Sequence, residues 1–139
     1  MKMRTLGQKR ARYALEEVLR LPEEVTKDFK SFSASAPSMI LQNGFGQSMA
    51  FWLAKGTDKD LKPKENDKHI LLFDIIKKWL SLNEGDVQND FMKPTETRSE
   101  FIKQLSDLDQ GAYLDAQRET LALLEWVKRF ASAEIKQGG

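Results

Sequence analysis

The chain has 139 residues, of which 40% are hydrophobic and 31% charged, so it is long enough for one domain with a proper hydrophobic core. Its 22 lysines and arginines against 21 acidic residues exclude the large positive excess of an autonomous nucleic-acid-binding protein, but permit a local basic face. The absence of cysteine excludes a disulfide framework, a thiolate metal site and a cysteine nucleophile.

The chain is predicted to be a cytoplasmic protein. Its first residues are basic, but no apolar run follows them, which argues against a secretory signal. No stretch approaches the roughly 18 consecutive apolar residues that indicate a membrane-spanning helix. We therefore expect no membrane partner.

Two helices are predicted in the first part of the chain. The first spans about residues 3–21 and has apolar side chains along one side at Leu6, Ala11, Ala14, Leu15, Val18 and Leu19. Pro22 restarts a helix, because proline suits a first helical turn and the two glutamates after it complement the helix dipole. This second helix should end at residues 33–35, ahead of another proline. Its apolar residues are Val25, Phe29 and Phe32.

A third helix is predicted over residues 36–56, with Pro37 in its first turn and Gly56 as its C-cap. The interior glycines Gly44 and Gly46 each cost roughly 1 kcal/mol relative to alanine, so a close approach by another backbone or a ligand must offset that cost. Two explanations remain open: helix packing inside the domain, and a surface that also meets a partner. The second predicts a subunit-packing site at Asn43, Gly44, Gly46 and Gln47.

A polar loop and a fourth helix follow. Residues 57–66 are polar and contain a proline, so we expect a flexible loop there. Asp67 should cap a helix over residues 69–83, and Gly85 is its natural stop.

Two further helices complete the predicted fold. Thr97, followed three residues later by Glu100, resembles a capping box for a short fifth helix through Leu108. The sixth and longest helix spans about residues 111–135 and carries a broad apolar stripe. No alternating strand pattern is sustained anywhere. The predicted fold is therefore all-α: a compact bundle of about six helices in a single domain.

No constellation of residues for catalysis is visible. His69, the only histidine, lies at a predicted helix N-terminus and cannot form a two-histidine metal site. The adjacent glutamates at 16–17 and 23–24 point in different directions on a helix. The glycines of a nucleotide-binding loop follow a β-strand, whereas no strand precedes the glycines of the third helix. We therefore predict that the protein is not an enzyme and takes no cofactor, metal or small-molecule substrate.

Basic side chains gather at three places. Two of them are helix ends, at Lys55 and at Lys128 and Arg129. The helix dipole alone favours cations in a last helical turn by roughly 0.3–1 kcal/mol, so it explains part of the clustering there. The third place lies in the first half of the first helix, where the dipole gives no such reason, so it is the better candidate for phosphate contacts. The candidate residues are Lys9, Arg10 and Arg12 on the first helix, Lys55 on the third, and Lys128 and Arg129 on the sixth.

Residues in three of the predicted helices match the sequence pattern of a known protein family. In the third helix these are Pro37-Ser-Met-Ile, Asn43-Gly44, Gly46-Gln47, Ala50-Phe51 and Lys55-Gly56. The fourth helix contributes Leu72 and Trp79-Leu80, and the sixth Tyr113, Thr120, Leu121, Leu124, Trp126 and Lys128-Arg129-Phe130-Ala131. Together they resemble the small, all-helical subunit of the type III-B CRISPR (Cmr) RNA-guided effector complex. The resemblance covers nearly the whole chain except residues 57–66 and 85–94. Ala36 and Phe45 stand where the family usually has leucine.

The resemblance implies a non-catalytic role in antiviral defence. Such subunits stack head to tail into a filament beside the subunits that hold the guide RNA, and cleavage belongs to other subunits. The implied partners are other Cmr subunits, copies of this chain, and the guide–target RNA duplex, whose backbone the three basic places would contact. An alternative remains open: a helical protein–protein adaptor without RNA contact, in which every basic cluster is merely solvated.

Overall fold

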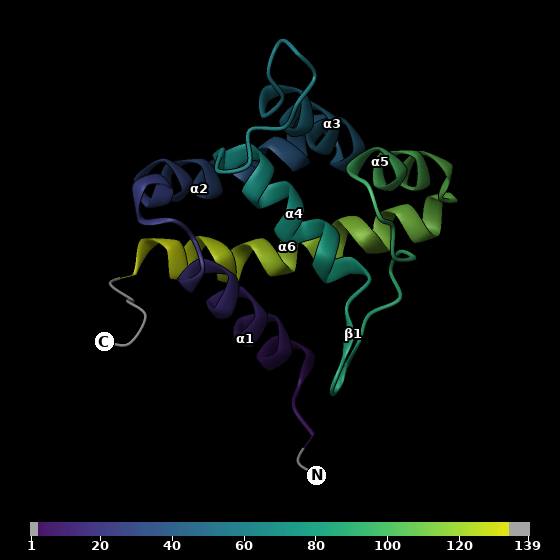
Figure 1. Ribbon diagram of the computed structural model, residues 1–139. Coiled ribbons are helices and arrows are strands. Elements are labelled where there is room, and N and C mark those ends of the chain that lie inside the picture. Colours follow the sequence, from purple (N-terminus) through teal and green to yellow (C-terminus); the bar gives the residue numbers. More distant parts are fainter. Residues whose placement is uncertain (1–2, 134–139) are drawn as a thin grey trace.

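The computed structural model describes residues 3–133, which contain six α-helices (Figure 1). They are α1 (Leu6–Leu19), α2 (Thr26–Asn43), α3 (Phe45–Lys55), α4 (Lys68–Leu80), α5 (Arg98–Asp107) and α6 (Gln110–Ser132). A 3₁₀ turn, η1 (Glu23–Val25), precedes α2, and a small hairpin of β1 (Asn83–Glu84) and β2 (Val87–Gln88) follows α4. The predicted six-helix, all-α domain is confirmed, with this hairpin as an addition. The predicted end of the sixth helix at residue 135 lies outside the described residues.

Helix α6 runs through the middle of the fold, with α1 on one side of it and α3 on the other (Figure 1). Helices α1 and α2 pack along α6, whereas α3 packs on α4. The core between the helices is rich in aromatic side chains, whose large apolar area contributes most to its stabilisation. Its largest fully buried members are Trp52, Trp79, Phe29, Phe45, Phe73 and Phe101.

The boundary between the second and third helices lies at Gly44, and not ahead of Pro37 as predicted. Helix α2 continues through the proline because buried side chains on either side of it, among them Phe32 and Ile40, pack in the core and offset the lost backbone hydrogen bond. The chain then turns at Gly44, whose φ of +87° favours glycine. The prediction of one helix over residues 36–56 is therefore wrong, because its first glycine marks a helix break.

Capping residues set the starts of several helices, and two of these caps are as predicted. The carboxylate of Asp67 accepts a hydrogen bond from the backbone N–H of His69 at 2.8 Å and so caps α4. The hydroxyl of Thr97 accepts one from the backbone N–H of Glu100 at 3.0 Å and caps α5. Thr5 caps α1 in the same way, so that helix begins slightly later than predicted.

The predicted stop of the fourth helix at Gly85 is wrong. Helix α4 ends at Leu80, and Gly85 instead provides the positive φ (+60°) that the turn of the hairpin requires. The reason is a tertiary cap: the side-chain amide of Asn89 donates to the backbone carbonyl of Trp79 at 2.7 Å, which satisfies the helix end and draws the following residues into the hairpin.

Gly56 ends α3, as predicted, and it also lets α4 approach closely. Its backbone N–H donates to the carbonyl of Trp52 at 2.9 Å. A Cβ at this buried position would lie 2.4 Å from Cγ1 of Ile70, far inside van der Waals contact. Close packing, and not an unusual φ, is therefore what requires glycine here.

Residues 57–66 form a compact hydrogen-bonded loop. The carboxylate of Asp58 accepts hydrogen bonds from the backbone N–H groups of Asp60 at 2.8 Å and Lys62 at 3.0 Å. Thr57 faces Pro63 across the loop in an isolated antiparallel bridge. The flexibility expected from the sequence stays a prediction for this loop.

Candidate nucleic-acid interface

Basic side chains surround a groove between α1 and the β1–β2 hairpin, which we name the α1 groove. Its volume is about 350 Å³. The lining includes Tyr13, whose hydroxyl donates to the carbonyl of Ile75 at 2.6 Å and whose burial raises the pKa of the phenol. The basic lining residues are Arg4, Lys9, Arg12, Arg20 and Lys78, and the acidic ones are Glu16 and Glu84. This excess of positive charge suits phosphate.

Four of the five cations of the α1 groove form ion pairs: Arg4, Arg12, Arg20 and Lys78. Arg12 pairs with Glu16 at 2.6 Å although its side chain is 67% exposed. Arg20 pairs with Glu17, which also lies 3.7 Å from the ammonium of Lys78. The Arg12–Glu16 pair is exposed at both side chains, and pairs of this kind contribute only about 0–1 kcal/mol. A phosphate can therefore replace Glu16 beside Arg12 at little energetic cost.

Arg4 fixes the hairpin against the start of α1. Its Nε donates to Oδ2 of Asp86 at 2.9 Å, and its Nη2 donates to Oδ1. These hydrogen bonds lower the pKa of Asp86 below its ordinary value of 3.8 and raise the pKa of Arg4. The two parallel hydrogen bonds orient the turn of the hairpin and so shape one wall of the α1 groove.

Arg10 joins α1 to α6 and does not line the α1 groove. Its Nε and Nη2 donate to the two carboxylate oxygens of Glu119 at 2.7 and 2.8 Å. The indole N–H of Trp79 donates to the same carboxylate at 2.9 Å. The side chain of Glu119 is 4% exposed and that of Arg10 20%, and the hydrogen bonds raise the pKa of Arg10 more than burial lowers it. Arg10 is therefore occupied by a structural contact.

The other predicted contact residues do not meet in the α1 groove. Lys55 ends α3, on the far side of α6 from α1 in Figure 1, and its ammonium lies 5.8 Å from the ring centre of Phe51. Lys128 and Arg129 lie toward the end of α6 and both pair with Glu125, at 3.2 and 4.0 Å. Of the six predicted residues, the structure brings only Lys9 and Arg12 together in one groove.

Three basic residues of the α1 groove were not predicted from the sequence: Arg4, Arg20 and Lys78. Helical spacing could have revealed Arg20, because Lys9, Arg12 and Arg20 are separated by three and eight residues and so share one face of α1. No comparable signal exists for Lys78, which only the packing of α4 beside α1 brings to the groove.

The four predicted subunit-packing residues fall into two pairs. Gly44 and Gly46 lie beside α6 of the same chain: the backbone N–H of Gly46 donates to the hydroxyl of Tyr113 at 2.7 Å, and a Cβ there would lie 3.3 Å from that oxygen. Packing inside the domain therefore explains Gly46, and the helix break explains Gly44. Asn43 and Gln47 are exposed and stay available to a partner.

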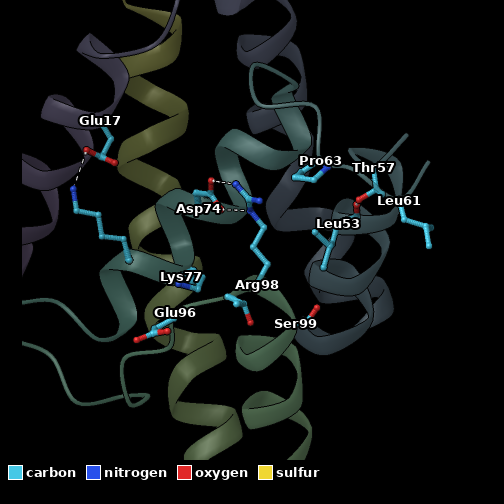
Figure 2. A pocket seen from close by; sticks show the side chains of 12 residues that line it. Glu17, Leu53, Thr57, Leu61, Pro63, Asp74, Lys77, Glu96, Arg98 and Ser99 are labelled. Carbon is cyan, nitrogen blue, oxygen red and sulfur yellow. Dashed lines mark hydrogen bonds and ion pairs between the residues drawn. The ribbon is translucent and has the colours of Figure 1, made fainter. Parts of the chain in front are cut away.

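A second hollow, shown in Figure 2, lies among α1, α3, α4 and the start of α5. Its volume is about 740 Å³, and several of its charged side chains are engaged with other groups of the chain. The guanidinium of Arg98 donates twice to Asp74, both times at 2.8 Å, and Lys77 donates to the carbonyl of Thr95 at 2.8 Å. His69 is not among the lining residues. The hollow thus places no histidine base beside its hydroxyl groups.

These features define a class of protein: a small helical domain that carries a basic groove on its surface. Within residues 3–133, no three side chains of histidine, cysteine, aspartate or glutamate gather in a way that could hold a metal ion. In the same range, no helix combines the length and the apolar content needed to cross a bilayer.

Comparison with known proteins identifies the family. The sequence profile of the CRISPR-associated protein family Cas_Cmr5 matches residues 6–134. The X-ray structure of a CRISPR-associated Cmr5 family protein from Thermus thermophilus aligns with a TM-score of 0.63 at 26% sequence identity, covering 96% of this chain and 100% of that one. The chain therefore belongs to the Cmr5 family, a non-catalytic subunit of the type III-B CRISPR Cmr complex. This confirms the resemblance read from the sequence.

Proposed function

We propose that the chain is a structural subunit that holds the guide–target RNA duplex of the Cmr complex by its backbone, in the cytoplasm, during antiviral defence. The observation that carries this proposal is the α1 groove, which is lined by five basic and two acidic side chains. Its contacts are to phosphate oxygens, so the subunit positions RNA without reading its sequence.

The balanced charge of the chain limits this activity to the assembled complex. A formal net charge of +1 gives the isolated subunit little attraction for RNA. Inside the complex the groove is held beside the duplex, and the high effective concentration makes a few phosphate contacts sufficient. Lys128 and Arg129 belong to the same proposal as separate contacts outside the α1 groove. Lys55, which ends α3 on the far side of α6 from that groove, is not part of it.

Matched charge variants test the RNA contact. Lys9→Gln with Arg12→Gln removes two positive charges from the α1 groove, and Lys59→Gln with Lys62→Gln removes two positive charges from exposed positions in the loop of residues 57–66. In the reconstituted complex, the groove variant should bind unrelated target RNAs more weakly and reduce the slope of log K against log salt by about 0.7–0.9 per lost phosphate contact. The control should change neither. Equal behaviour of the two variants would overturn the proposal.

We also propose that copies of the chain stack head to tail beside the duplex. A head-to-tail contact joins two different faces of the chain, and faces that carry both signs of charge suit it. One such face is offered by α5 and the first half of α6, with the exposed residues Glu100, Lys103, Asp107, Asp115 and Arg118. Native mass spectrometry of the reconstituted complex tests this: several copies support stacking, and a single copy excludes a filament.

A protein adaptor that never touches RNA is the second candidate. One observation favours it: four of the six predicted contact residues form ion pairs within the chain, namely Arg10, Arg12, Lys128 and Arg129. The matched charge variants separate the two candidates, because an adaptor leaves the affinity for target RNA and its salt dependence unchanged in both.

A further inference from the structure

Residues 31–54 form an unusually long uncharged stretch. Between Lys30 and Lys55 there are 24 residues without an aspartate, glutamate, lysine or arginine, although 31% of the chain is charged. No other stretch without these residue types exceeds five residues. The stretch makes up most of α2, the break at Gly44 and all but the last residue of α3.

Much of this stretch is at the surface. Its exposed residues are Ser31, Ala34, Ser35, Ser38, Leu41, Gln42, Asn43, Gln47, Ala50, Phe51 and Ala54, which we name the α2–α3 face. The side chain of Leu41 is 69% exposed and that of Phe51 49%. Solvated surfaces normally carry charged side chains, whereas depletion of charge together with an aromatic residue is typical of the core of protein–protein interfaces.

The corner between the two helices of the α2–α3 face is fixed in place by α6. The backbone N–H of Phe45 donates to the side-chain oxygen of Gln117 at 3.2 Å, and that of Gly46 donates to the hydroxyl of Tyr113 at 2.7 Å. The ring of Phe45 is fully buried, which anchors the first turn of α3. A partner therefore meets a preformed surface and loses little affinity to the ordering of this chain.

We propose that the α2–α3 face docks onto another protein subunit of the Cmr complex, one that presents an uncharged surface of apolar, amide and hydroxyl groups. The inference rests on the proposed function as a subunit of that complex. RNA does not suit this face, because phosphate binding depends on cations and none of the residues of the face is charged. Lys55 lies at its edge, with its ammonium 5.8 Å from the ring centre of Phe51.

A second copy of the chain does not suit the α2–α3 face either. Head-to-tail stacking joins two different faces, and elsewhere in the chain charged residues interrupt the sequence at least every sixth residue. Two copies could match their uncharged faces only by pairing face to face, which closes a dimer and leaves no filament. The complementary surface is therefore that of a different subunit.

The α2–α3 face and the α1 groove can be occupied together. Helix α3 lies on the opposite side of α6 from α1, as Figure 1 shows. One side of the subunit can thus contact the RNA backbone while α3 contacts protein.

Single charges introduced into the α2–α3 face test the inference. Leu41→Glu and Phe51→Glu each place a charge among the exposed uncharged residues. Leu61→Glu is the matched control, because Leu61 is 84% exposed and lies in the loop outside the α2–α3 face. Each variant is assayed for its melting temperature, for its mass in solution as an isolated chain, and for its affinity for a Cmr complex reconstituted from the other subunits.

We expect all three variants to melt like the wild type and to remain monomeric. Leu41→Glu and Phe51→Glu should weaken incorporation into the complex at least about tenfold, as loss of a central interface residue does, and Leu61→Glu should not. Unchanged incorporation of both face variants would overturn the inference while leaving the proposed function intact. If the isolated wild-type chain is a dimer and either face variant makes it monomeric, the face belongs to a second copy and the inference is also overturned. Failure of the wild-type chain to enter the complex would refute the proposed function and this inference with it.

Discussion

Replacement of Glu119 by alanine is expected to destabilise the fold by about 4 kcal/mol. The change removes a buried carboxylate and leaves the guanidinium of Arg10 and the indole N–H of Trp79 without their acceptor. Breaking a buried ion pair from one side costs roughly 3–5 kcal/mol, because the charge that remains stays desolvated. Arg10 keeps some exposure, so the lower end of that range applies, and the unpaired indole adds about 1 kcal/mol.

Urea unfolding, followed by circular dichroism and by tryptophan fluorescence, measures this loss. Arg12→Ala is the control, since it removes an arginine of the same helix from an exposed pair and should cost less than about 0.5 kcal/mol. The double variant Arg10→Met with Glu119→Leu should be more stable than Glu119→Ala, because it leaves no unpaired charge in the interior. A loss below about 1 kcal/mol for Glu119→Ala, at an unchanged m value, would refute this reasoning.

Three further outcomes are expected. Gly56→Ala should lower the free energy of unfolding by about 1–3 kcal/mol through the overpacking described above, whereas Gly7→Ala, where an added methyl meets nothing closer than 3.8 Å, should raise it by about 0.5–1 kcal/mol; thermal melts that rank the two variants the other way would contradict this. The carboxyl of Asp86 should titrate below 3.8 by NMR, so its pair with Arg4 contributes fully above that pH and is lost as the pH falls through the lowered pKa; Arg4→Ala should raise the pKa toward its ordinary value, and an unchanged pKa would contradict the assignment. Amide hydrogens of residues 57–66 should exchange faster than those of the helix interiors, and equal protection would rule out a flexible loop.

Local signals predicted much of the fold. The starts of α4 and α5 follow from Asp67 and Thr97, because an N-cap acts on backbone groups two or three residues away and can be read without knowing the rest of the structure. Hydrophobic spacing likewise predicted the helical class, since each helix buries one face.

Boundaries that depend on tertiary contacts could not be predicted. Proline usually ends a helix, yet α2 passes through Pro37 because the core holds the residues around it, and the propensity rule gave the wrong break. The end of α4 depends on the side chain of Asn89, which reaches back over ten residues to the carbonyl of Trp79. No local sequence pattern predicts that contact.

The candidate site was predictable only in part, for the same reason. Lys9 and Arg12 were identified because they cluster in the first half of a helix, and the structure places both in the α1 groove. Arg10 lies between them in sequence but its helical position directs it to Glu119 on α6. Lys78 comes from a helix that is remote in sequence. Charge clusters in a sequence therefore identify candidates, and packing decides which of them are free to bind.

Photocrosslinking in the reconstituted Cmr complex, loaded with guide and target RNA, tests most directly that the subunit contacts RNA on one side and protein on another. A photoreactive phenylalanine analogue is introduced either in place of Glu84, which is exposed beside the α1 groove, or in place of Phe51 on the α2–α3 face. We predict that the analogue at position 84 crosslinks to RNA and that the analogue at position 51 crosslinks to a different protein subunit. RNA crosslinks from position 51, or none from position 84 in a fully assembled complex, would contradict that arrangement.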